Sequence, residues 1–108
     1  MIEIRQYVDR LGRNPFEKWY LGLDAPVRAR IAIVLDRLGS GNLSSIKGVG
    51  SGVFEIRLDF GPGYRVYLGK DGETIVILLG GGTKKRQQAD IEEAQGLWQE
   101  YRRRKREE

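Results

Sequence analysis

The segment from residue 53 to residue 86 constrains the fold most strongly, because it predicts three short strands joined by tight turns. Apolar and polar side chains alternate in residues 53–60 and again in residues 64–68, which is the period of a strand with one covered face. The sequence Lys70-Asp71-Gly72 is a strong hairpin signal. Residues 74–79 are apolar on both sides and suit a central strand. The segment therefore predicts a small, mainly antiparallel sheet.

The N-terminal part of the chain predicts one strand followed by two helices. Residues 2–8 alternate weakly and suit a first strand. Asn14 is placed to cap a short helix that ends near Gly22. A second helix begins after Asp24, and its apolar residues recur at helical spacing until Gly39 stops it.

The remaining segments complete an α+β arrangement. Residues 39–52 are rich in glycine and serine and predict a loop. A last helix begins around Gln87. The predicted order is β-α-α-β-β-β-α in a single domain of residues 1–108, with the helices on one face of the sheet.

Composition narrows the chemistry that is open to the chain. It has no cysteine and no histidine, so the usual thiolate and imidazole ligands, nucleophiles and bases are missing, and we expect neither a metal nor a cofactor. The net charge is +4, but residues 101–108 hold five basic and two acidic side chains and predict a basic C-terminal tail. No signal peptide and no membrane-spanning run is visible, so we expect a cytoplasmic protein.

Two arginines lie inside the predicted strands, where apolar or neutral residues are usual. Strand alternation places Arg57 and Arg65 on one face together with Glu55 and Tyr67, and we expect that face to be open. Cations held on a rigid sheet can bind and polarise a phosphate. The alternative is a surface salt-bridge ladder, in which Arg57 pairs with Glu55 or Asp59 and contributes under ~1 kcal/mol. An exposed Tyr67 could stack on a base.

A second basic cluster, Lys84-Lys85-Arg86, follows three consecutive glycines. One interpretation is a solvated turn ahead of the last helix. The other is a phosphate site, in which these cations meet the same phosphate as the strand arginines, helped by the backbone N–H groups of the helix start. The glycines have neither the spacing of a phosphate-binding loop nor that of a dinucleotide fingerprint.

These motifs together resemble the RelE/ParE toxin superfamily, and within it the HigB-like and phage killer-protein branch. The resemblance is carried by Glu55-x-Arg57, by Gly63-x-Arg65, by the Lys84-Lys85 pair at the end of a strand, and by the helix opening at residues 89–94. Lys47, in the loop ahead of the glycines, also fits the branch. The resemblance spans nearly the whole chain.

The resemblance implies the toxin of a type II toxin–antitoxin pair. Relatives of the RelE and HigB type cleave mRNA on the ribosome, whereas those of the ParE type inhibit DNA gyrase by binding. Cleavage would use the substrate 2′-OH as the nucleophile, with Arg57 and Arg65 on the phosphate and Lys84, Lys85 or Glu55 adding charge or moving a proton. Lys47, Tyr67 and Arg86 would bind RNA. The partners would be ribosome, mRNA and a DNA-binding antitoxin of helix-turn-helix or ribbon-helix-helix type; a non-toxic nucleic-acid binder is the third possibility.

Overall fold

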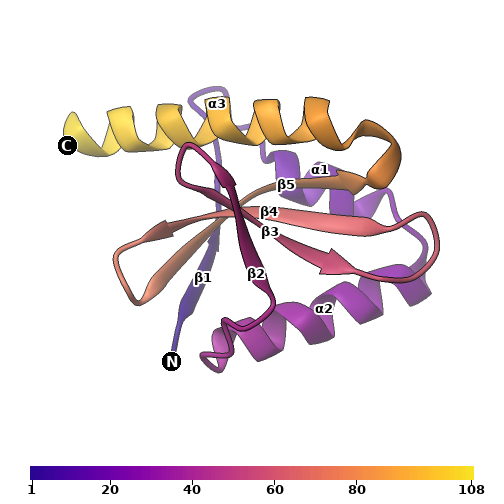
Figure 1. Ribbon diagram of the computed structural model, residues 1–108. Helices are drawn as coiled ribbons and strands as arrows, with labels where there is room; N and C mark the ends of the chain where they lie inside the picture. The colour runs from indigo at the N-terminus through magenta and orange to yellow at the C-terminus, as the bar shows by residue number, and fades with distance from the viewer.

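A sheet of five strands in the order β1-β5-β4-β3-β2 forms the centre of the protein, and the computed structural model describes all residues, 1–108 (Figure 1). β1 pairs with β5 in parallel, and every other neighbouring pair is antiparallel. The elements follow the chain as β1 (Glu3–Gln6), α1 (Pro15–Leu21), α2 (Ala25–Gly39), β2 (Ile46–Gly50), β3 (Val53–Leu58), β4 (Tyr64–Asp71), β5 (Ile75–Thr83), the short 3₁₀ helix η1 (Lys84–Arg86) and α3 (Gln87–Arg106). The predicted α+β class and the mainly antiparallel sheet are confirmed.

The two N-terminal helices begin at the residues that the sequence predicts. Asn14 caps α1, because its side-chain oxygen accepts a hydrogen bond from the backbone N–H of Glu17 at 3.0 Å. Asp24 occupies the capping position of α2 without making a side-chain hydrogen bond. α2 continues to Gly39, the glycine at which the apolar pattern stops.

The prediction that residues 39–52 form only a loop is wrong, because β2 lies within them. Ile46, Lys47 and Gly48 pair with Ile56, Glu55 and Phe54 at the edge of the sheet. The turn from β2 to β3 is Gly50-Ser51-Gly52, and all three residues have positive φ angles of 96°, 55° and 81°. The glycines that make the segment read as a loop are therefore those that such a tight turn requires.

β5 is longer than predicted, since it runs through the three glycines to Thr83 rather than ending at residue 79. These glycines form strand, and two of them receive large side chains from the helices on either side. A β-carbon on Gly81 would lie 2.3 Å from the Trp19 ring of α1, and one on Gly82 would lie 2.0 Å from Asp90 Oδ2 of α3. The glycine run therefore allows two helices to approach the same strand closely.

The helices lie on both faces of the sheet, so the prediction that they share one face is wrong. α1 and α2 cover the face that carries Ile56, Val66 and Leu78. α3 lies across the opposite face, where Ala94 and Trp98 belong to the same buried cluster as the sheet residues Val53, Tyr67, Ile77 and Leu79 (Figure 1). The apolar residues of that second face, spread over three strands, need a cover of their own.

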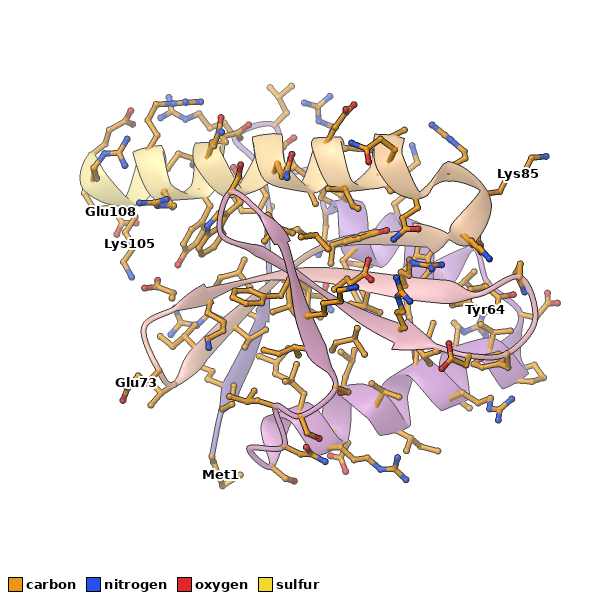
Figure 2. The ribbon with its side chains drawn as sticks, in the orientation of Figure 1. Met1, Tyr64, Glu73, Lys85, Lys105 and Glu108 are labelled. Atoms are coloured by element: carbon orange, nitrogen blue, oxygen red, sulfur yellow. The ribbon has the colours of Figure 1, made fainter.

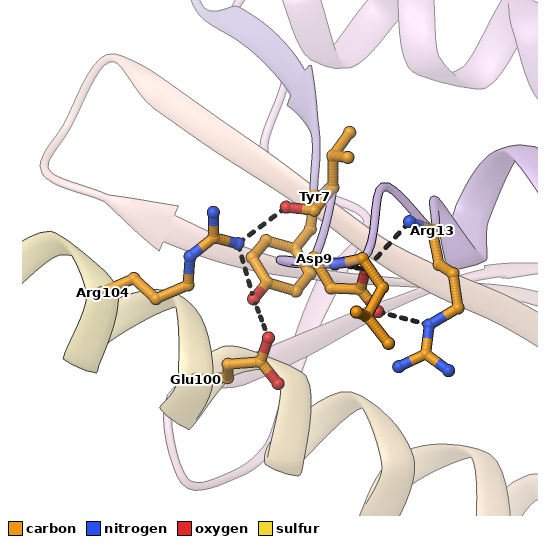
Figure 3. A network of polar contacts seen from close by, with 7 residues as sticks. Tyr7, Asp9, Arg13, Glu100 and Arg104 are labelled. Carbon is orange, nitrogen blue, oxygen red and sulfur yellow. Dashed lines mark hydrogen bonds and ion pairs between the residues drawn. The ribbon is translucent and has the colours of Figure 1, made fainter.

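The C-terminal basic segment is the end of α3, which remains helical to Arg106, and its cations contact the body. Arg104 Nη1 donates to Val8 O at 2.8 Å and to the Tyr7 hydroxyl at 3.1 Å, and that hydroxyl donates to Glu100 Oε1 at 2.5 Å (Figure 3). Lys105 pairs with Asp71, the last residue of β4. The predicted tail is thus a docked helix end. None of the helices combines the length and the apolar character needed to cross a bilayer.

Candidate functional site

A buried carboxylate surrounded by arginines lies on the face of the sheet that α3 partly covers. Glu55 is 1% exposed, and its cross-strand neighbours are Lys47 on β2 and Tyr67 on β4. Arg57, two residues further along β3, lies directly opposite Arg65. The strand register therefore brings Lys47, Glu55, Arg57 and Arg65 into one group, which we call the Glu55 cluster.

Glu55 uses both carboxylate oxygens to hold its neighbours. Oε2 accepts a hydrogen bond from Arg57 Nε at 2.8 Å, and Oε1 accepts one from Gln87 Nε2 in the first turn of α3 at 3.2 Å. Arg65 Nε lies 3.8 Å from Oε1. Because each oxygen already accepts a hydrogen bond and the carboxylate is buried, Glu55 positions the arginines and is not open to a substrate.

Arg65 is held inside the site, with only 5% of its surface exposed. Its Nη1 donates to the carbonyl oxygen of Gly63 at 2.9 Å, and its buried Nε has no hydrogen-bond partner. An unpaired buried donor beside a carboxylate is a costly arrangement for a purely structural residue. Arg65 therefore retains a free N–H group directed into the cluster.

Arg57 and Lys47 supply the accessible positive charge of the Glu55 cluster. The Arg57 side chain is 47% exposed although Glu55 fixes its Nε. Lys47 is exposed on the edge strand. Lys84, at the start of η1, lies close by, because a β-carbon on Gly63 would be 3.4 Å from both Lys84 Cβ and Arg65 Nη1. An anion at Arg57 would thus meet several cations from different elements.

The three basic residues of η1 do not converge on this site. Successive residues of a 3₁₀ turn are about 120° apart around the axis, so neighbouring side chains diverge. Lys85 points away from the body at the tip of η1 (Figure 2). Arg86 lines a cavity of about 390 Å³ between α1 and α3, together with Lys18 and Asp90. Of the three, only Lys84 lies next to the Glu55 cluster.

The prediction of an exposed Tyr67 on an open face is wrong. Tyr67 is 1% exposed beneath α3, so its ring cannot stack on a base in this arrangement. Burial, and then the nearby charges of Glu55 and Asp90, raise the pKa of its hydroxyl to about 12. That hydroxyl is buried without a hydrogen-bond partner, and Tyr67 is one of the residues that line the cavity between α1 and α3.

Two residues of α3 that the sequence did not identify complete the surroundings. Gln87 contributes the hydrogen bond to Glu55, and Asp90 lies against Gly82, the residue opposite Arg65 on β5. Burial raises the pKa of the Asp90 carboxyl, with the Arg86 charge acting in the opposite direction. The sequence could have indicated these two residues only by their position, at the start of a helix that follows a glycine-rich segment. No group of three or more carboxylates is arranged to hold a metal ion.

The fold and the site define a small α+β protein whose mixed sheet carries a buried carboxylate among preorganised cations, an arrangement that suits a phosphate or another anion. No protein-family model matches the chain. A protein of Haemophilus influenzae, described as an uncharacterized protein, is 44% identical to it over 86 residues, which is 79% of this chain and 87% of the relative. The chain belongs to the same family as that protein.

Proposed function

We propose that this protein is the toxin of a type II toxin–antitoxin pair and that it cleaves mRNA on the ribosome without a metal. The proposal rests on two supports: the sequence resemblance to RelE/ParE toxins, and the Glu55 cluster that the fold assembles. The observation that carries it is the exposed Arg57 guanidinium, fixed at Nε by a carboxylate that is 1% exposed. A cation fixed in this way needs little reorganisation when charge develops on a phosphate.

The chemistry we propose is attack of a substrate 2′-OH on the adjacent phosphorus. The P–O5′ bond breaks, leaving a 2′,3′-cyclic phosphate and a free 5′-OH. Arg57 would bind a non-bridging phosphate oxygen, and the free Nε–H of Arg65 would face the same charge after a small side-chain movement. Both interactions strengthen as negative charge develops on the phosphate oxygens, which is the requirement for catalysis.

The proton transfers fall to the lysines in this scheme. Glu55 is occupied by Arg57 and Gln87, so it is a positioning residue. Lys47 belongs to the cluster and Lys84 lies next to it, and both side chains are exposed, so either ammonium group could reach a substrate oxygen. Lys85 points outward and would contact a partner such as the ribosome rather than the scissile phosphate.

The test uses purified protein with translating ribosomes and a defined mRNA, whose cleavage sites are mapped by primer extension. Wild-type protein is expected to make codon-linked cuts, and Arg57→Gln is expected to lower the cleavage rate about 100-fold, the loss typical of one preorganised donor. Arg102→Gln is the matched control, because Arg102 is exposed on α3 and forms no ion pair. Intact mRNA with folded wild-type protein would refute the nuclease assignment.

One observation favours a second candidate, a gyrase inhibitor that acts by binding. Arg65 is 5% exposed and donates to the backbone of Gly63, as a residue with a structural role would. In that case the exposed cations would recognise a protein surface. A supercoiling assay separates the two functions, since only the inhibitor would block gyrase at concentrations that leave mRNA uncut.

Both candidates require an antitoxin, for which we propose a DNA-binding protein whose acidic segment covers Arg57, Lys47 and Lys84. Co-expression with the protein encoded by the neighbouring gene, followed by purification of the pair, tests this. Masking of these three side chains is expected to appear as reduced chemical labelling of Lys47 and Lys84 in the complex.

A further inference from the structure

A groove lined by three arginines lies between α2 and the end of β3, on the side of the sheet away from α3. Arg30 and Arg37 of α2 line it with Arg57 of β3, and Ile33 and Phe60 form part of its apolar wall, around a volume of about 340 Å³. No acidic residue lines it. In Figure 1, α2 runs below the end of β3 at this place.

The groove exists because the edge strand is short. Pairing between β2 and β3 ends at Ile46 and Ile56, so Arg57 and Leu58 extend beyond the strand that would otherwise flank them. The Arg57 side chain can therefore belong to the Glu55 cluster through Nε and also line the groove. The two sites are continuous through this one residue.

Two of the three arginine charges in the groove, those of Arg30 and Arg37, are not neutralised within the protein, whereas Arg57 pairs with Glu55. Arg30 and Arg37 take part in none of the ion pairs of the structure. They are seven residues apart, which places them on the same side of α2 and about 10.5 Å apart along its axis. The Arg30 guanidinium carbon lies 4.1 Å from the centroid of the Phe60 ring, which holds that cation in place.

We propose that this groove binds the sugar–phosphate backbone of single-stranded RNA and continues the path of a strand whose phosphate lies at Arg57. Arginines in a groove with an aromatic ring and aliphatic walls are the combination that suits single-stranded nucleic acid, since guanidinium groups bind phosphates and apolar walls receive sugars or bases. Ile33, which is 53% exposed, supplies such a surface. The inference rests on the proposed function, because RNA is the substrate there.

Binding of a single-stranded RNA about ten nucleotides long, a length within the range of such sites, tests the proposal. The RNA carries 2′-O-methyl groups, so that it cannot be cleaved, and fluorescence anisotropy gives its dissociation constant from low to high salt. Each phosphate contact on single-stranded nucleic acid contributes about 0.7 to the slope of log affinity against log salt. Arg30→Gln/Arg37→Gln is expected to reduce the slope by about 1.4, which means about 25-fold weaker binding at ~0.1 M salt.

The matched control is Arg102→Gln/Arg103→Gln, which removes the same charge from the exposed C-terminal half of α3. It is expected to leave the slope within about 0.3 of the wild-type value. Equal losses in the two double variants, or no loss in the groove variant, would overturn the proposal. The proposal would also be overturned if Arg30→Gln/Arg37→Gln lost affinity for an acidic peptide but bound RNA as tightly as the wild type. Because the RNA is uncleavable, failure of the nuclease activity would leave this result interpretable.

Discussion

Replacing Glu55 by glutamine is expected to destabilise the fold by about 3 kcal/mol. The side chain is 1% exposed, and its carboxylate is the only ion-pair partner of Arg65, which is 5% exposed. Glutamine keeps the shape but removes the charge, so the Arg65 guanidinium becomes a buried cation without compensation. Breaking such a pair costs ~3–5 kcal/mol, and we take the lower end because the half-exposed Arg57 keeps much of its hydration.

Urea unfolding, followed by the fluorescence of Trp19 and Trp98, measures this change. Both tryptophans pack against the sheet, one on each face, so one transition seen by both would report the whole domain. With a urea m-value of about 2 kcal/mol/M, the expected loss moves the midpoint down by about 1.5 M.

A double-mutant cycle distinguishes a lost ion pair from a general packing defect. Arg65→Met removes the buried cation, so Glu55→Gln is expected to cost at least ~1 kcal/mol less in the Arg65→Met background than in the wild type. Strict additivity, or a loss below ~1 kcal/mol for Glu55→Gln alone, would show that the carboxylate does not hold the arginines. The positioning role in the proposed mechanism would then fail as well.

Two further substitutions test the packing on either side of the sheet. Gly81→Ala is expected to cost about 1–3 kcal/mol, because the new methyl group would lie 2.3 Å from the Trp19 ring, whereas Gly80→Ala meets nothing within 4 Å and is the matched control in the same urea assay. Equal effects of the two changes would contradict the close packing of α1. Tyr67→Phe is expected to leave stability at pH 7 within ~0.5 kcal/mol of wild type, because the hydroxyl has no hydrogen-bond partner. Since burial raises the pKa of Tyr67 from 10.0 to about 12, its contribution is complete below pH 10 and is lost as the pH rises toward 12. Tyr67→Phe should therefore lose less stability than wild type over that interval. If the urea midpoints of the two proteins fell in parallel with pH, the raised pKa of Tyr67 would be refuted.

The strand alternation in residues 53–68 was sufficient to predict which side chains share a face. Glu55, Arg57, Arg65 and Tyr67 do lie on one side of β3 and β4, because side chains of a strand alternate whatever surrounds it. The helix starts at Asn14 and Asp24 were equally local and were predicted correctly. Capping and alternation depend on residues within a few positions of one another, so one sequence is enough to recognise them.

The environment of that shared face was decided by tertiary structure. Nothing near Tyr67 in the sequence indicates that α3, which begins twenty residues later, would cover it, and so its exposure was predicted wrongly. The extension of β5 through its three glycines was missed for a related reason. Two of these glycines, Gly81 and Gly82, are explained by Trp19 and Asp90, which come from two different helices.

Local patterns in the chain were enough to predict the α+β class, the alternation of the strands and the residue types that can bind an anion. Long-range contacts in the folded protein account for three further features: Glu55 is buried between Arg57 and Arg65, Lys84 rather than Arg86 lies beside them, and Arg57 is shared with a second groove. The physical reason is that burial and charge pairing are set by segments far apart in the chain. Strand alternation and helix capping, in contrast, depend only on residues that are close together in the sequence.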